Sequence, residues 1–378
     1  MTIQLSDYRA AIRVVGVGGA GCNAVNTMIA AGLGSVDFIV ANTDRQALEQ
    51  NAAPIKVQIG SGVTRGLGAG ANPEVGRQAA LEDEERLREL LDGSDMVFVA
   101  AGMGGGTGTG AAPVIAQTAR AAGALTVGVV TRPFVFEGKV RSRIAAQGLE
   151  ELQRHVDSLI VIPNEKLFTV AQRQTTLVEG FRMADAVLLH AIKSIADLIN
   201  VPGLINLDFA DVKTIMADMG MAFMGMGVHS GEGRAAEAAR KAISNPLLDD
   251  ISIRGARGML INITGSSSMT FQDLEEATGF IREEAHEEAN IIFGAAIDES
   301  LGERFQITVI ATGFAAQQGQ VREAPAAGKE PVVTQLDEVR LERLRQDARV
   351  VKLGTIISEF ADDGEYDIPT FVRRQQMM

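Results

Sequence analysis

The sequence predicts an α/β fold in which a Rossmann-like parallel sheet is followed by a long central helix and a smaller α/β domain. Three observations support this prediction. Short apolar runs alternate with helical segments from Ile12 to about Ile199, glycine-rich turns follow two of these runs, and strand-like runs return near Met259. Apolar strands that alternate with helices are typical of a parallel sheet covered on both faces.

The expected strands of the first domain are short apolar runs rich in valine and isoleucine. They are Ile12–Val17, Val36–Asn42, Ile55–Ile59, Met96–Ala101, Leu125–Val130 and Ser158–Ile162. Helices are expected between them at Asn23–Ala31, Leu81–Leu91 and Pro113–Ala122. The proline is expected to open the last of these helices, since its fixed backbone torsion suits a first turn.

A long buried helix is expected at about residues 175–200. Its apolar residues recur at helical spacing and are Phe181, Ala184, Leu188, Ile192, Ile195 and Ile199. Further apolar residues extend this surface around most of the cylinder, as in helices buried between two layers. We therefore expect this helix to join two domains.

The smaller domain is predicted from three strand-like runs, Met259–Thr264, Ile291–Ile297 and Phe305–Thr312. Helices near Glu232–Ser244 and Phe271–Glu288 are expected to cover its sheet.

The C-terminal part of the chain differs in composition. From Ala315 to about Glu365 it is rich in Gln, Glu, Ala, Pro and Arg, which predicts a disordered or partly helical linker. The segment Tyr366–Arg374 regains apolar residues and carries two positive charges, as a short docking peptide on a tether would.

Composition excludes several classes of function. The net charge of −13 argues against a general attraction to nucleic acid or to an anionic membrane, so any phosphate must be held locally by backbone N–H groups. The single cysteine, Cys22, excludes an intramolecular disulfide and fits a reducing compartment. No signal peptide and no apolar run of about 18 residues is evident, so we expect a cytoplasmic protein without membrane insertion.

The first glycine loop, Gly16-x-Gly18-x-x-Gly21, lies between an expected strand and an expected helix. Alone it is a weak signal. It fits a dinucleotide-binding turn with Asp44 as the ribose-binding acid, and a tight turn without a ligand is the less favoured alternative.

A second loop, Gly102–Gly110, holds six glycines in nine residues. We expect these glycines to expose successive N–H groups as an anion-binding nest rather than to serve packing, with two threonine hydroxyls as further donors. No lysine follows in the form of a P-loop. Two glycine loops around one site predict a polyphosphate ligand held almost wholly by backbone.

A third glycine-rich stretch, Thr64–Pro73, has the composition of a mobile loop. It fits a switch that closes over the terminal phosphate, and it equally fits a flexible surface loop.

Several ordered motifs resemble one family. The run AGMGGGTGTGAAP resembles the tubulin/FtsZ family, and the runs TRGLGAGANPEVG, RPFVFEG, NLDFADV and DIPTFVRRQ resemble its bacterial cell-division branch. The resemblance covers about residues 12–314 and the terminal peptide. It implies the tubulin/FtsZ fold and a cytoskeletal GTPase that forms head-to-tail filaments in the cytokinetic ring at mid-cell.

The resemblance also implies site residues. Phosphate and nucleotide contacts are expected from Gly19, Ala20, Gly21, Cys22, Asn23, Gly106, Thr107 and Gly108. Glu137 and Arg141 are similar to the ribose and phosphate contacts, Phe181 to the residue that stacks on guanine, and Asn164 to a further base contact. Asp185 is expected to accept hydrogen bonds from the guanine ring N–H and amino group.

Acidic residues follow the central helix in the run Asn206-Leu207-Asp208-Phe209-Ala210-Asp211. Asp208 and Asp211 can face one point at the start of a helix expected over 210–219, and Asn206 can orient the same water. Asp208 also reads as a helix N-cap, and both interpretations can hold together.

A helix of about 25 residues spans close to 38 Å. Asp208 therefore cannot reach the γ-phosphate of its own subunit, whereas a second copy stacked head to tail can bring its acids there, and such a contact propagates as a filament. The resemblance implies that Asn206, Asp208 and Asp211 act on the neighbour's GTP. Mg²⁺ is expected on the phosphates, with water as its main other ligand and no dedicated protein site.

These interpretations divide the chain into seven parts. They are a tail 1–11, a nucleotide-binding domain 12–174, the central helix 175–200, a catalytic loop and helix 201–220, a C-terminal domain 221–315, a linker 316–365 and a peptide 366–378. The peptide, through Asp367–Gln375, is expected to bind membrane-tethering division adaptors. No nucleic acid partner is expected.

Some positions depart from the family's common pattern, namely Ala20, Cys22, Met183, Ala186 and His190. As a separate hypothesis, Cys22 near a helix N-terminus is a reactive thiolate. Two rival functions stay open: a redox Rossmann enzyme that uses the first glycine loop, and a tubulin-like filament with another task such as DNA partition.

Overall fold

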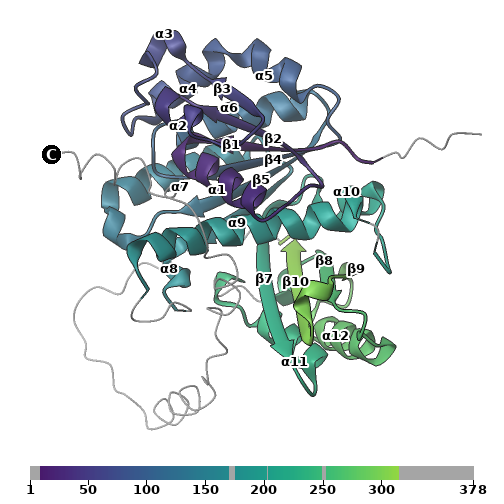
Figure 1. Ribbon diagram of the computed structural model, residues 1–378. Helices are drawn as coiled ribbons and strands as arrows, with labels where there is room; N and C mark the ends of the chain where they lie inside the picture. Colours follow the sequence, from purple (N-terminus) through teal and green to yellow (C-terminus); the bar gives the residue numbers. More distant parts are fainter. Residues whose placement is uncertain (1–8, 170–174, 202, 249–252, 315–378) are drawn as a thin grey trace, which may run out of the picture. The chain divides into compact units, whose positions relative to one another are not determined.

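The computed structural model describes residues 9–169, 175–201, 203–248 and 253–314 (Figure 1). The predicted linker and C-terminal peptide lie outside the described residues, as does most of the predicted N-terminal tail.

The strands form one ten-stranded sheet. In their order across it they are β3 (Ile55–Gln58), β2 (Asp37–Asn42), β1 (Ile12–Val17), β4 (Met96–Gly102), β5 (Leu125–Arg132), β6 (Ser158–Pro163), β7 (Gly220–Ser230), β10 (Arg304–Thr312), β8 (Gly258–Gly265) and β9 (Asn290–Ile297). The strands from β3 to β7 are parallel, and β10 runs antiparallel to both β7 and β8. The predicted α/β fold class is confirmed.

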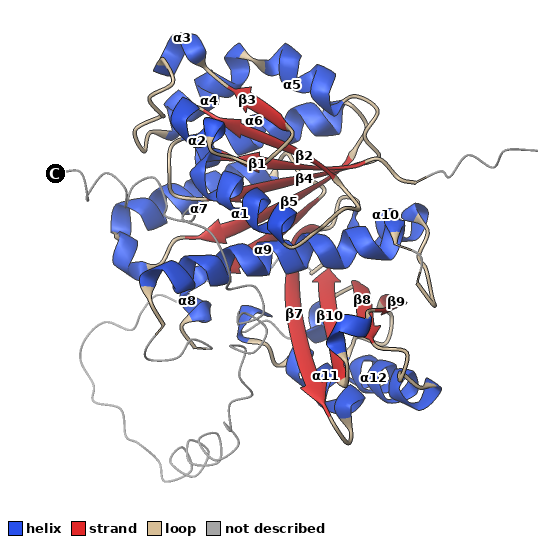
Figure 2. Ribbon diagram, viewed as in Figure 1, coloured by secondary structure: helices blue, strands red, loops and turns tan. Residues whose placement is uncertain are grey.

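Helices lie on both faces of the parallel region, as Figure 2 shows. They are α1 (Gly18–Ala30), α2 (Arg45–Glu49), α3 (Ser61–Thr64), α4 (Pro73–Glu82), α5 (Glu84–Leu91), α6 (Thr107–Ala121), α7 (Lys139–Gln153), α8 (Asn164–Leu167) and α9 (Leu177–Asn200). After α9 come α10 (Phe209–Met216), α11 (Arg234–Ile243) and α12 (Phe271–Glu284). Helices α4, α5 and α7 pack beside α6 on one face, and α1 packs against α9 on the other.

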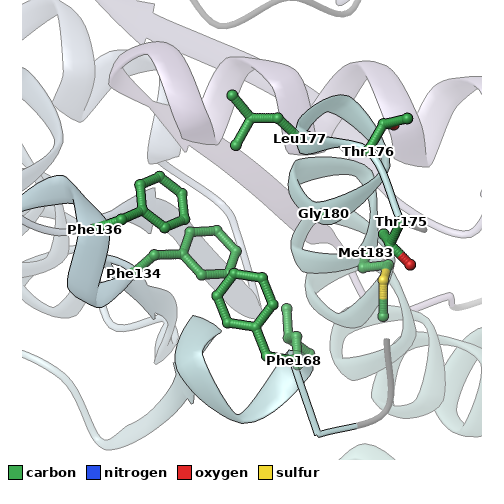
Figure 3. A pocket seen from close by; sticks show the side chains of 9 residues that line it. Phe134, Phe136, Phe168, Thr175, Thr176, Leu177, Gly180 and Met183 are labelled. Atoms are coloured by element: carbon green, nitrogen blue, oxygen red, sulfur yellow. The ribbon is translucent and has the colours of Figure 1, made fainter. Parts of the chain in front are cut away.

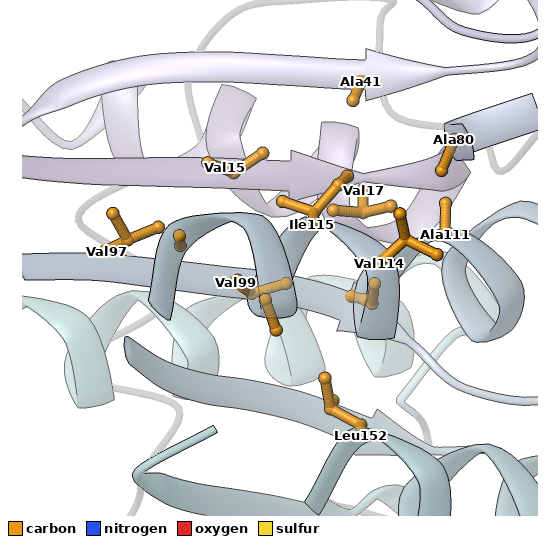
Figure 4. Close-up of a cluster of buried hydrophobic side chains, with 14 of the residues drawn as sticks. Val15, Val17, Ala41, Ala80, Val97, Val99, Ala111, Val114, Ile115 and Leu152 are labelled. Carbon is orange, nitrogen blue, oxygen red and sulfur yellow. The ribbon is translucent and has the colours of Figure 1, made fainter. Parts of the chain in front are cut away.

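The core beneath α6 is built from alternate strand residues (Figure 4). Val15 and Val17 of β1 and Val99 of β4 lie under Ile115 of α6, and all four are fully buried. The intervening residue Val14 is also fully buried, because the opposite face of the sheet is covered too.

The central helix forms as predicted. Thr176 caps it and forms a reciprocal capping box with Glu179, which fixes where α9 begins. At its far end the side-chain amide of Asn200 donates hydrogen bonds to the carbonyls of Ala10 and Ser35, at 3.1 and 2.9 Å.

Three predicted helices differ from the structure. Helix α1 begins at Gly18 and α6 at Thr107, so each starts inside its glycine loop rather than after it. Pro113 lies in the interior of α6 and does not open it. The predicted helix Leu81–Leu91 is divided at Asp83 between α4 and α5.

Strand β7 was not predicted, because its run GMAFMGMGVHS carries glycine and methionine where β-branched residues are typical. Its glycines serve packing. A Cβ added at Gly225 or Gly227 would lie 2.0 Å from a backbone carbonyl oxygen of α11. These glycines therefore let α11 lie directly on the strand.

Candidate functional site

Two glycine loops meet at the carboxyl ends of β1 and β4. A Cβ added at Gly18 would lie 2.8 Å from the backbone nitrogen of Gly108, and one added at Gly102 would lie 2.5 Å from Cβ of Ala20. The loops therefore interlock and bring the first turns of α1 and α6 together. The first N–H groups of a helix lack intrahelical partners, so two adjacent N-termini have the donors that a phosphate ligand requires.

The glycines of the second loop also serve packing, contrary to the prediction. A Cβ at Gly108 would lie 2.6 Å from the carbonyl oxygen of Gly102, and one at Gly110 would lie 1.9 Å from that of Pro73. Gly105 differs, because a Cβ there would meet no heavy atom within 4 Å. Open space in front of the loop therefore lies at Gly105.

The two threonines of this loop have different partners. Thr109 is buried and its hydroxyl accepts a hydrogen bond from the Gly104 N–H at 2.8 Å, so it stabilises the loop from within. The hydroxyl of Thr107 lies 2.6 Å from that of Thr43, a fully buried residue just after β2. Sequence reasoning missed Thr43, since a threonine after a strand carries no signal by itself.

The third glycine-rich loop packs against the second. A Cβ added at Gly106 would lie 2.8 Å from Cβ of Ala69 and 2.9 Å from the nitrogen of Asn72. Arg65 and Ala71 both adopt the left-handed backbone conformation, with φ of 54° and 59°, which L-residues adopt at a cost. The third loop therefore covers one side of the second glycine loop, Gly102–Gly110, and does so in a strained conformation.

The predicted base-binding residues follow β6 and begin α9. Asn164 is buried at the carboxyl end of β6, and its Oδ1 has no hydrogen-bond partner. Phe181 meets Phe134 edge to face, with ring centroids 5.5 Å apart, and Asp185 lies one helical turn beyond Phe181. A buried oxygen without a partner is costly, so Asn164 fits a residue that completes its hydrogen bonds on a ligand.

Glu137 and Arg141 form an ion pair, with Arg141 Nη1 donating to Glu137 Oε2 at 2.5 Å. The other oxygen of Glu137 accepts from the N–H of Phe134 at 3.0 Å. The carbonyl of Arg141 lies 2.9 Å from a Cβ added at Gly104, so the start of α7 borders the phosphate loop. The pair thus lies between Phe134 and the second glycine loop.

The remaining predicted contacts lie on the first turns of α1. They are Gly19, Ala20, Gly21, Cys22 and Asn23. Cys22 is 2% exposed, with its Sγ 3.9 Å from Nδ2 of Asn42, and burial raises the pKa of its thiol to about 12. The hypothesis of a reactive Cys22 thiolate is therefore wrong, because burial outweighs the favourable helix N-terminus.

Asp44, the candidate ribose-binding acid of the dinucleotide interpretation, caps a helix. Its Oδ1 accepts from the N–H of Ala47 at 3.2 Å in the first turn of α2.

The three predicted catalytic residues lie close together after α9: Asn206 and Asp208 in the loop between α9 and α10, and Asp211 in the first turn of α10. Asp208 caps α10, since its Oδ1 accepts from the Asp211 N–H at 2.8 Å, which confirms the capping interpretation. Asn206 Oδ1 accepts from the Gly203 N–H at 2.6 Å. Asp208 and Asn206 are exposed and Asp211 is half-buried, so water reaches this loop.

Helix α9 separates the acids from the glycine loops. Near its first turns Phe181 touches Phe134, which follows the carboxyl end of β5. Its last residue, Asn200, bonds Ala10 and Ser35, which precede the amino ends of β1 and β2. The 24 residues of α9 span roughly 36 Å. The acids therefore lie near the amino ends of the parallel strands, whereas the glycine loops lie at their carboxyl ends.

An apolar cavity of about 180 Å³ lies beside the start of α9 (Figure 3). The rings of Phe134, Phe136 and Phe168 line one side, and Gly180 and Met183 of α9 line the other. The described residues that line it carry apolar side chains or hydroxyls. None of these lining residues belongs to the two glycine loops that follow β1 and β4.

None of the helices in the described part of the chain has the length and apolarity needed to cross a membrane.

Comparisons with known proteins agree with this arrangement. The profile described as Tubulin/FtsZ family, GTPase domain, matches residues 11–172, and that of the FtsZ family, C-terminal domain, matches residues 220–315. Cell division protein FtsZ of Caulobacter vibrioides is 55% identical over 319 residues, which cover 83% of this chain and 63% of that protein. The chain thus spans less than two thirds of that relative's length. Cell division protein FtsZ of Pseudomonas aeruginosa is 48% identical over 381 residues, covering 97% of each chain.

Solved structures give the same result. An FtsZ dimer from M. jannaschii matches with a TM-score of 0.78 and 45% identity, over 82% of this chain and 90% of that one. CetZ2 from Haloferax volcanii, at 20% identity and a TM-score of 0.70, shares the fold. The resemblance drawn from the ordered motifs is confirmed: the chain belongs to the tubulin/FtsZ family, and within it to the FtsZ proteins.

Proposed function

We propose that this chain binds GTP, hydrolyses it in a site completed by a second copy, and assembles head to tail into filaments of the bacterial division ring. The observation that carries the proposal is the separation along α9. The candidate acids and the glycine loops lie at opposite edges of one sheet, joined by a helix of 24 residues.

Nucleotide binding is assigned to the carboxyl edge of the sheet. The N–H groups at the starts of α1 and α6 hold the phosphates, since they are orphan donors at positive helix ends. Glu137 and Arg141 bind ribose and phosphate. Asp185 and Asn164 accept from the donor edge of guanine, and the partnerless Oδ1 of Asn164 supports this assignment.

Hydrolysis is assigned to the loop that follows α9 of the neighbouring copy. A water oxygen bonds to the γ-phosphorus as the bond to the β–γ bridging oxygen breaks, which yields GDP and phosphate. Asp211 and Asp208 orient this water and accept its proton, and Asn206 holds the loop through Gly203. Mg²⁺ would neutralise charge on the phosphates. Phosphate and water are its expected ligands, because hydrated Mg²⁺ prefers to keep its waters.

Assembly follows from this geometry, because a contact between opposite ends of identical chains does not close on itself. The M. jannaschii relative is described as an FtsZ dimer, and the bacterial relatives as cell division proteins. We assign the chain to the cytoplasm at the mid-cell ring on these grounds. The segment Asp367–Gln375, with Ile368, Pro369 and Phe371 as apolar contacts, is proposed to bind a membrane-tethering adaptor.

The proposal is tested by measuring GTP turnover and light scattering as protein concentration rises. Turnover per chain is expected to increase above a threshold concentration at which scattering and filaments in electron micrographs also begin. Turnover strictly proportional to protein from nanomolar concentrations upward, without filaments, would refute assembly-dependent hydrolysis. A parallel titration with NAD excludes the redox alternative when GTP binds and NAD does not.

A further inference from the structure

Thr43 joins the second glycine loop, Gly102–Gly110, to the third, Thr64–Pro73. It is fully buried directly after β2, and its hydroxyl lies 2.6 Å from the hydroxyl of Thr107. Thr107 is the first residue of α6 and remains half-exposed at the loop that faces open space. Thr43 itself is enclosed, so it reaches a ligand only through Thr107.

The main-chain carbonyl of Thr43 accepts hydrogen bonds from the first half of the third loop. It accepts from the Gly68 N–H at 3.2 Å and from the Thr64 hydroxyl at 3.3 Å. Two residues further along the chain, the Arg45 N–H donates to the carbonyl of Gly66 at 3.1 Å. One residue therefore contacts both loops that border the phosphate site.

A hydroxyl has one hydrogen to donate, which limits how the two threonines can bond. If Thr107 donates to a phosphate oxygen, its own oxygen is free to accept, and the buried hydroxyl of Thr43 is the donor beside it. The resulting chain, from Thr43 to Thr107 to phosphate, is polarised along its length and fixes the Thr107 side chain in one rotamer.

We propose that Thr43 is a positioning residue that aims the Thr107 hydroxyl at the nucleotide phosphates and ties this donor to the third glycine loop. The inference rests on the proposed nucleotide binding and adds a residue that never touches the ligand. It predicts that the Thr43 hydroxyl contributes to the affinity for phosphates and contributes nothing to the affinity for the base.

The test replaces the hydroxyl at nearly constant volume and measures affinity by competition against a fluorescent GDP analogue. Thr43→Val is expected to lower the affinity for GDP and GTP about fivefold, as for one lost hydrogen bond. Its affinity for guanosine is expected to stay within about twofold of the wild-type value. Thr43→Ser, which keeps the hydroxyl, restores nucleotide affinity. Thr118→Val, at a buried threonine of α6 whose hydroxyl donates to the Val114 carbonyl within its own helix, controls for the substitution itself.

A double-mutant cycle shows whether Thr43 acts through Thr107. In a Thr107→Val background, Thr43→Val is expected to cause no further loss of GDP affinity. Additive losses, equal losses of guanosine and GDP, or unchanged GDP affinity in Thr43→Val would each overturn the proposal. These outcomes are distinct from failure of the proposed function, in which the wild-type chain itself does not bind GDP.

Discussion

The backbone N–H of Asp211 donates to the side chain of Asp208 at 2.8 Å, so two candidate catalytic acids are also joined as a helix cap. Because Asp211 uses its backbone in this bond, its carboxylate is not needed for the cap. Capping and catalysis can therefore be separated by substitution.

Asp211→Asn and Asp208→Asn are expected to lower GTP turnover at least a hundredfold and to leave GTP affinity unchanged. Asparagine is a good N-cap at position 208, and the Asp211 carboxylate takes no part in the cap, so neither variant should lose stability. Asp208→Ala should lose turnover and also about 1 kcal/mol of unfolding free energy. Steady-state phosphate release and denaturant titration measure the two effects, and Glu85→Gln on α5 is the matched control. Full turnover in Asp211→Asn contradicts its assigned role.

Asn164 and Asn200 offer a matched pair, because each has a buried Oδ1 without a partner. Asn164→Leu should leave the stability of the nucleotide-free protein unchanged or slightly raised, and should lower GDP affinity about tenfold. Asn200→Leu removes two hydrogen bonds to Ala10 and Ser35, so it should lower stability and spare affinity. Thermal unfolding measures the stability of both variants, and nucleotide titration measures their affinity for GDP. The same pattern in both variants would argue against Asn164 as a base contact.

Gly105 and Gly110 are expected to respond oppositely to alanine. Gly105→Ala should keep wild-type stability and lower nucleotide affinity, because its Cβ would enter the open space before the loop. Gly110→Ala places a Cβ 1.9 Å from the carbonyl oxygen of Pro73 and should cost roughly 2–5 kcal/mol of stability. Unfolding curves and GDP titrations compare the two. A destabilised Gly105→Ala would show that this position is packed.

His190 should make the protein less stable in mild acid. Burial lowers its pKa below the ordinary value, while Nδ1 lies 2.6 Å from the Ala186 carbonyl. As the pH falls below about 6.5, the unfolded chain binds the proton first, so the unfolding free energy falls by up to about 1.4 kcal/mol per pH unit. His190→Gln should flatten this slope between pH 6.5 and 5.5, with His286→Gln as the exposed control. An unchanged slope contradicts a His190 that stays neutral in its partly buried site.

The sequence predicts those features that local pattern determines. The strands from Ile12–Val17 to Ser158–Ile162 and the central helix follow from apolar periodicity, and both glycine loops are visible as composition. The features it missed depend on contacts distant in sequence. Strand β7 uses glycines because α11 lies on it, and the second loop needs Gly110 because α4 approaches it. Thr43 becomes informative only beside Thr107, 64 positions away.

The family resemblance supplied roles for Phe181 and Asp185. Apolar periodicity alone predicts only that their helix is buried, and it gives neither residue a binding role. The Cys22 hypothesis failed for a physical reason. A helix N-terminus lowers the pKa of an exposed thiol, whereas full burial raises it, and exposure is not readable from the motif.

The central claim, that one copy supplies the acids for another copy's nucleotide, is tested most directly by mixing two inactive variants. Asp185→Asn is expected to bind GTP poorly but to carry intact acids, whereas Asp211→Asn binds GTP but lacks the acid. Co-sedimentation establishes that the two variants assemble together. The account predicts that the mixture releases phosphate well above the sum of the separate rates. Co-assembled mixtures that stay inactive would contradict it.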